Sequence, residues 1–122
     1  MFLQLAHTKL NVYQFSQAMT LECHKLTRRF PGDEKFAMVK QIRRAALSVH
    51  LNIAEGCSGK SKTERNRYYE IARGSVIETD AAIGIAHQLS YATLDQLQSL
   101  GDSIVNTFKL LSGMISQNNT PT

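Results

Sequence analysis

Apolar residues recur at helical spacing along most of the chain. Between residues 39 and 53 they are separated by three or four positions, which is the repeat of a helix that buries one face. Three other segments show the same repeat, and no segment has the strict alternation of a strand, so the sequence predicts an all-α fold. The expected buried stripes are Val12, Phe15, Met19 and Leu26; Val39, Ile42, Ala46, Val49 and Ile53; Tyr68, Ile71, Ser75, Glu78, Ala82, Ile85 and Leu89; and Leu97, Leu100, Ile104, Phe108, Leu111 and Ile115.

Residues typical of turns and helix ends separate these stripes. Pro31 and Gly32 divide the first two helices, and residues 56–59, rich in glycine, divide the second from the third. Ser61 and Thr93 are each followed three residues later by Glu or Gln, which is the capping-box pattern of a helix start. The pattern therefore predicts four separate helices joined by short turns.

The helices are expected at about residues 8–29, 33–55, 62–91 and 94–117. Gly56 stands where a left-handed residue would end the second helix. Short joints favour antiparallel neighbours, so we expect residues 1–122 to form a single domain, an antiparallel up-down-up-down four-helix bundle.

Two helices carry more apolar surface than one bundle needs. Leu47 and Leu51 flank the main stripe of the second helix, while Tyr69, Val76 and Ile83 recur every seven residues on a second face of the third helix. A second apolar face has to be covered by another surface. We therefore expect a homo-oligomer.

A carboxylate, Glu78, falls within the expected buried stripe of the third helix. A buried carboxylate is costly unless it is paired and hydrogen-bonded. Arg43 and Arg44 on the preceding helix are its natural partners, so we expect a structural polar pair that fixes the register of the two helices.

Positive charge is concentrated in the middle of the chain. The net charge is +4, but residues 28–67 hold ten Lys and Arg against four acids, a balance of +6. This balance favours weak, sequence-tolerant binding of RNA or DNA, since phosphate contacts require only positive charge; a merely solvated surface is the alternative. The candidate nucleic-acid-binding residues are Arg28, Arg29, Lys35, Lys40, Arg43, Arg44, Lys60, Lys62, Arg65 and Arg67.

Other chemistry finds less support in the sequence. No Glu-x-x-His pair is present, so we expect no metal site, and no motif for a cofactor occurs. Arg44 and His50 resemble the Arg-x(4–6)-His signature of HEPN ribonucleases, which leaves a catalytic alternative open. The two cysteines, the short apolar start of the chain and the lack of a long apolar run predict a cytoplasmic protein without a membrane span.

Two segments resemble one bacterial family. The run Gln41-Ile42-Arg43-Arg44-Ala45-Ala46-Leu47-Ser48-Val49-His50-Leu51-Asn52-Ile53-Ala54-Glu55-Gly56 and the later Arg73-Gly74-Ser75-Val76-Ile77-Glu78 are similar to the signature segments of the four-helix-bundle proteins first noticed as products of 23S ribosomal RNA intervening sequences. His50 departs from that pattern, where proline is common. The resemblance implies a non-enzymatic homo-oligomer, with a homopentamer known from relatives, and an adaptor role by analogy with accessory subunits of retroelement reverse transcriptases. A HEPN-like ribonuclease and a purely structural oligomer are the alternatives.

Overall fold

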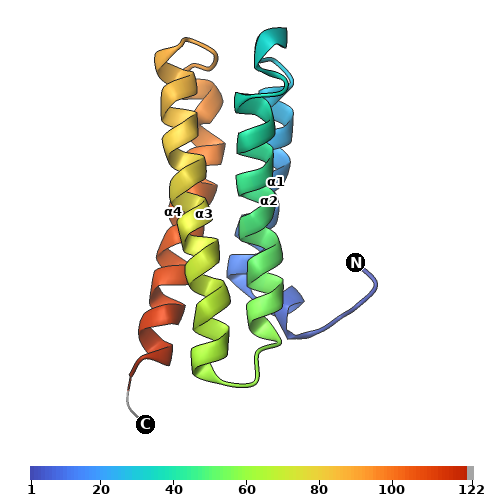
Figure 1. Cartoon of the computed structure of the whole chain (residues 1–122), viewed down its shortest axis with the longest axis vertical. Helices are drawn as coiled ribbons and strands as arrows, with labels where there is room; N and C mark the ends of the chain where they lie inside the picture. Colours follow the sequence, from blue (N-terminus) through green and yellow to red (C-terminus); the bar gives the residue numbers. More distant parts are fainter. Residues whose placement is uncertain (121–122) are drawn as a thin grey trace.

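Four α-helices lie side by side along their length in the computed structural model, which describes residues 1–120 (Figure 1). They are α1 (Asn11–Thr27), α2 (Met38–Cys57), α3 (Lys62–Gln88) and α4 (Leu94–Asn118). Two short 3-10 helices, η1 (Ala6–Lys9) and η2 (Gly32–Glu34), precede α1 and α2. Since residues 1–120 contain no strand, the prediction of an all-α protein with four helices is confirmed. Figure 1 shows the α1–α2 and α3–α4 connections at one end and the α2–α3 connection at the other.

The helix ends differ from the expected ones for local reasons. α1 and α2 begin three and five residues later than expected, because η1 and the turn after η2 occupy those positions. The backbone of Ala37, with φ −118° and ψ −98°, is not helical. α3 ends at Gln88 because Ser90 adopts a left-handed conformation with φ 65°. Gly56 has no positive φ and lies inside α2, so the prediction that it ends the helix was wrong.

The second helix buries the predicted stripe. Val39, Ile42, Ala46, Val49 and Ile53 are all buried, and they pack with residues of the other three helices in one core. Burying a large side chain such as Ile42 contributes about 1.5–3 kcal/mol. The apolar repeat of the sequence therefore predicts correctly which face of α2 is buried in the core.

The third helix buries a different face from the predicted one. The expected stripe with Glu78 faces outward, and Ile71 and Ile85 on it are 46% and 49% exposed. The stripe assigned to another subunit enters the core instead, together with small residues between its members: Tyr69, Ala72, Val76, Thr79, Ile83 and Ala86. Only one of the two apolar stripes is free of charge, and burying the other would have desolvated a carboxylate.

The three threonines buried in the core are hydrogen-bonded within their own helices. The hydroxyls of Thr27, Thr79 and Thr107 donate to the carbonyl oxygens four residues earlier, at 2.6, 2.8 and 2.7 Å. A buried hydroxyl bonded in this way leaves no unpaired group behind. Threonine can therefore occupy these buried positions, where the helical repeat favours an apolar residue.

The packing of α2 against α3 depends on one glycine. A Cβ added to Gly56 would lie 2.5 Å from Cε1 and 2.8 Å from Cδ1 of Tyr69, which is itself buried. The hydroxyl of Tyr69 donates to the sulfur of Cys57 at 3.5 Å, and burial together with this bond raises the pKa of the tyrosine. The ring thus covers the C-terminal turn of α2, at the end of the bundle where α3 begins.

Candidate functional site

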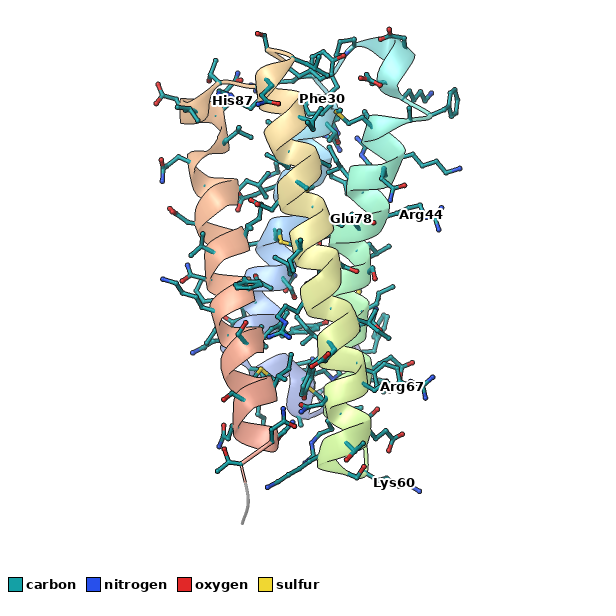
Figure 2. The ribbon with its side chains drawn as sticks, turned by 60° about the vertical axis from the view of Figure 1, so that its left-hand side comes forward. Phe30, Arg44, Lys60, Arg67, Glu78 and His87 are labelled. Atoms are coloured by element: carbon teal, nitrogen blue, oxygen red, sulfur yellow. The ribbon has the colours of Figure 1, made fainter. Side chains whose placement is uncertain are left out.

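The ten predicted basic residues lie in two groups at opposite ends of the bundle. The first group, at the α1–α2 connection and in the first two turns of α2, consists of Arg28, Arg29, Lys35, Lys40, Arg43 and Arg44. The second group, at the α2–α3 connection and the start of α3, consists of Lys60, Lys62, Arg65 and Arg67. Figure 2 shows Arg44 and Arg67 pointing outward on the same side, and Lys60 at the tip of the bundle. The basic residues that are concentrated in one segment of the sequence are thus divided between two regions of the bundle, here called the two basic ends.

None of these ten cations takes part in an ion pair within the described residues. Among residues 1–120 the ion pair within 4.0 Å joins Arg73 to Glu70, and neither belongs to the predicted set. Arg43 and Arg65 are half-buried and hydrogen-bonded to the protein, whereas the other eight are exposed. Exposed cations without an ion pair remain available to phosphate oxygens.

A shallow pocket opens within the first basic group. It has a volume of about 230 Å³, and its lining includes Arg28, Lys35 and Arg43 and no acidic residue. The nearby carboxylate of Glu34 instead accepts a hydrogen bond of 2.9 Å from the hydroxyl of Tyr91 in the α3–α4 connection. The pocket is therefore the most positive concave surface within the first group.

Arg43 also performs a structural task. Its Nε donates to the hydroxyl of Thr27 at 2.9 Å, and its Nη2 donates to the carbonyl of His24 in the last turn of α1 at 3.2 Å. A cation at a helix C-terminus stabilises the otherwise unpaired carbonyls. Partial burial, and then the charges of Arg43 and Arg28, lower the pKa of His24.

The predicted pair between Glu78 and an arginine does not form. Glu78 is exposed, and its Oε2 accepts a hydrogen bond of 3.1 Å from the side-chain amide of Gln41. Arg43 is directed to α1, as described above, and Arg44 points into solvent at the level of Glu78 (Figure 2). The pair was expected because Glu78 was placed in the core, and the rotation of α3 removes the desolvation cost that would have required a cation.

The two family-like segments meet on one surface, the α2/α3 face, formed by Gln41, Arg44, Ser48, Asn52, Ser75 and Glu78 together with the exposed Leu51 and Ile71. Ser75 donates to Ser48 across the two helices at 3.1 Å, beside the bond from Gln41 to Glu78. Asn52 donates to the carbonyl of Ser48 at 2.9 Å. This face combines hydrogen bonds between the two helices with exposed apolar side chains.

The catalytic alternative requires Arg44 and His50 to act together. Six residues on a helix correspond to about 600°, so the two side chains point about 120° apart. His50 faces α1, where its Nδ1 lies 2.7 Å from the hydroxyl of Ser16 and its ring lies 4.2 Å from that of Tyr13. Burial, and then the charge of His7, lower the pKa of His50. The geometry therefore favours a packing role for this histidine.

Ser16 and Tyr13 were not among the residues singled out from the sequence. Ser16 is fully buried and lies in the α1 stripe, where the repeat alone suggested only apolar neighbours. The partnership with His50 joins residues 34 positions apart, so only the packing of α1 on α2 reveals it. No local signal in the sequence could have found this contact.

Metal-binding and membrane-spanning features do not occur in the described part of the chain. Within residues 1–120 no group of three or more His, Cys, Asp and Glu side chains is placed to hold a metal ion. Over the same residues, none of the helices combines the length and apolar character required to cross a membrane.

The fold and the α2/α3 face define an all-α protein of four helices whose two signature segments share one exposed surface. The model of the family described as 23S rRNA-intervening sequence protein matches residues 8–113, and the chain belongs to that family. A solved structure with the same fold is a protein of unknown function from the S23 ribosomal protein family of Bacteroides thetaiotaomicron VPI-5482. It is 26% identical, with a TM-score of 0.78, over 85% of this chain and 97% of the other. Among proteins with curated descriptions, none matches this chain.

Proposed function

We propose that this protein is a non-enzymatic, homo-oligomeric bundle of antiparallel up-down-up-down helices that acts in the cytoplasm as an adaptor and binds RNA or DNA through its two basic ends. The observation that carries this proposal is the set of eight exposed cations that have no ion pair among residues 1–120. Each copy presents only a few phosphate contacts, so binding by one copy is weak and tolerant of sequence.

Exposed apolar side chains support the oligomeric part of the proposal. Exposed Leu51 and Ile71 on the α2/α3 face are large apolar side chains on neighbouring helices, and a second copy would cover them. An oligomer repeats both basic ends in each copy, which raises affinity for a long polyanion without any new contact. A homopentamer, as known from relatives, would present five copies of each end.

The ribonuclease hypothesis finds weaker support, because His50 is held against Ser16 and Tyr13 on a different side of α2 from Arg44. A purely structural oligomer without a polyanion partner is the remaining alternative. Both hypotheses give outcomes distinct from those of the adaptor in one binding experiment.

The experiment measures the affinity of the full chain for a fluorescently labelled RNA, and for DNA of the same length, as salt is increased. The logarithm of the affinity should fall linearly with the logarithm of the salt concentration. Arg67→Gln should weaken binding for all sequences and reduce the slope by roughly one for each phosphate that the protein no longer neutralises. Arg73→Gln is the matched control, because Arg73 already faces Glu70 on the same helix. Lys35→Gln tests the opposite end, because Lys35 is exposed in the α1–α2 connection and lies outside the α2/α3 face.

Cleavage of the RNA is followed in the same samples with His50→Ala. Loss of cleavage with retained binding would establish the nuclease and contradict the adaptor. An absence of both cleavage and salt-sensitive binding would leave the structural oligomer.

A further inference from the structure

The first five residues form an apolar segment that the bundle leaves uncovered. The arm, defined as Met1–Leu5, is not helical, and Figure 1 shows it running away from the helices. Phe2 and Leu3 are 87% and 66% exposed. The arm is attached at its inner end, where the carbonyl of Leu5 accepts a hydrogen bond from the amide of Thr8 in η1. These neighbouring exposed side chains form contiguous apolar surface that the copy itself does not cover.

An apolar groove of about 280 Å³ lies between α3 and α4. The α3/α4 groove is lined by Val76, Ile77, Asp80, Ile104, Val105, Phe108 and Lys109. Ile77, Val105 and Phe108 are 56%, 49% and 38% exposed, which is high for such large apolar side chains. Ligand pockets usually measure about 300–1,000 Å³, so this groove suits one or two side chains better than a whole small molecule.

The arm cannot reach the groove of its own copy. Leu5 lies beside Cys57 and Ser58, at the end of the bundle where α3 begins. Gly56, next to Cys57, lies against Tyr68 of α3, and Ile77 is nine residues further along, which corresponds to about 13 Å along the helix axis. Phe2 is three residues from Leu5, so the two can be at most about 11 Å apart. η1, which follows the arm, packs on α1 and α2, so the arm would also have to cross the bundle to reach the side of α3 and α4. The groove is therefore within reach only of an arm from another copy.

We propose that the arm of one copy docks in the α3/α4 groove of the next copy, where Phe2 and Leu3 contact Ile77, Val105 and Phe108. This inference rests on the homo-oligomer of the proposed function and specifies one of its contacts. Donor and acceptor are different surfaces of the chain, so the interface is heterologous and leads to a closed ring when the rotation between copies closes. The α2/α3 face stays free for further contacts, since it shares no residue with the groove.

Disulfide trapping tests whether the arm of another copy occupies the α3/α4 groove. A tagged Leu3→Cys chain is mixed with an untagged Val105→Cys chain, both carrying Cys57→Ser, because Cys57 lies close to the arm. Cys23 can stay, since burial, and then the charge of Glu22, raise its pKa to about 12. We expect a covalent product containing one chain of each kind. In the matched control, Leu21→Cys replaces Val105→Cys, because Leu21 is exposed on α1. This control should give little of the covalent product. Equal yields from the two partners would overturn the proposal.

A second measurement separates this inference from the oligomer itself. Light scattering of the full chain carrying Phe2→Ser and Leu3→Ser should show half-assembly at a concentration at least about tenfold higher, because the interface no longer buries two apolar side chains. Val105→Asp should produce a similar shift, whereas Leu21→Asp should not. If the unaltered protein is monomeric, the proposed function fails. If it is oligomeric and neither the arm nor the groove variant shifts assembly, the arm proposal alone fails.

Discussion

At the residue scale, the side chains of the two family-like segments differ in how far they connect the helices of the bundle. Arg43 joins α2 to the last turn of α1, whereas the adjacent Arg44 is exposed. Glu78 has one exposed hydrogen bond, to Gln41. Neighbouring residues of the same type therefore differ in what they contribute to stability.

Arg43→Ala should lower the free energy of unfolding by about 1–3 kcal/mol, because the mutation removes two hydrogen bonds from a charged donor and leaves the buried hydroxyl of Thr27 with one partner fewer. Arg44→Ala and Glu78→Ala should each change it by less than about 1 kcal/mol. Urea unfolding of the three variants checks this ranking. A loss for Glu78→Ala as large as that for Arg43→Ala would contradict the assignment of Glu78 to the surface.

Gly56→Ala should destabilise the protein by about 1–3 kcal/mol, because the new methyl group would overlap the ring of the buried Tyr69. Gly74→Ala is the matched control, since an added Cβ there meets nothing within 4 Å and the residue is also helical. That control should gain up to about 1 kcal/mol from improved helix propensity. Thermal unfolding of both variants distinguishes close packing from a general demand for glycine.

At the scale of single helices, side-chain caps mark the starts of α3 and α4, whereas α1 and α2 begin without one. The predicted capping box at Thr93 is present, with its hydroxyl bonded to the amide of Gln96 and its amide bonded to the side chain of Gln96. Ser61 caps α3 through a bond to the amide of Glu64. The C-terminus of α3 is less well suited to its sequence, since Ser90 adopts the left-handed conformation that glycine favours.

Ser90→Gly should therefore stabilise the protein, by about 0.5–1 kcal/mol. Two bonds already close this helix end, from the amide of Tyr91 to the carbonyl of Ala86 and from the amide of Ser90 to the carbonyl of His87. Glycine keeps both bonds and removes the steric cost of the left-handed backbone. Urea unfolding measures the gain, and Ser90→Ala is the control that should show none. A loss of stability in Ser90→Gly would mean that the serine side chain contributes more than its backbone costs.

At the scale of the whole molecule, the surface combines two basic ends with apolar side chains that a single copy leaves exposed. On α2 these are Leu47 and Leu51, and on α3 they are Ile71 and Ile85. A monomer would keep this apolar area in contact with water, at a cost that grows with area. The proposed assembly would cover these apolar side chains, and the proposed polyanion binding would use the two basic ends; Arg44 belongs to both the α2/α3 face and a basic end.

Light scattering of the purified full chain should report a multiple of 13.6 kDa, and five times this mass would match the proposed homopentamer. The mass should stay constant as salt is raised, because apolar contacts are not screened, while binding to RNA weakens. A monomer at micromolar concentration would contradict the homo-oligomer.

Local patterns in the sequence specify the number and type of the helices and the buried face of α2. Both follow from local spacing, turn residues and caps, and these act within a few positions of the chain. The sequence also shows that positive charge is concentrated in the middle third, although not that this charge divides between two ends of the bundle.

The face of α3 that enters the core, in contrast, was set by the packing of the four helices. Two apolar stripes compete on that helix, and periodicity cannot choose between them; packing chose the stripe that keeps Glu78 in water. The partners of His50 and Arg43 were likewise fixed by α1, because contacts between residues 34 and 19 positions apart leave no trace in local spacing. The roles of single side chains in this protein thus depend on how the helices are rotated against one another, which is a property of the assembled bundle.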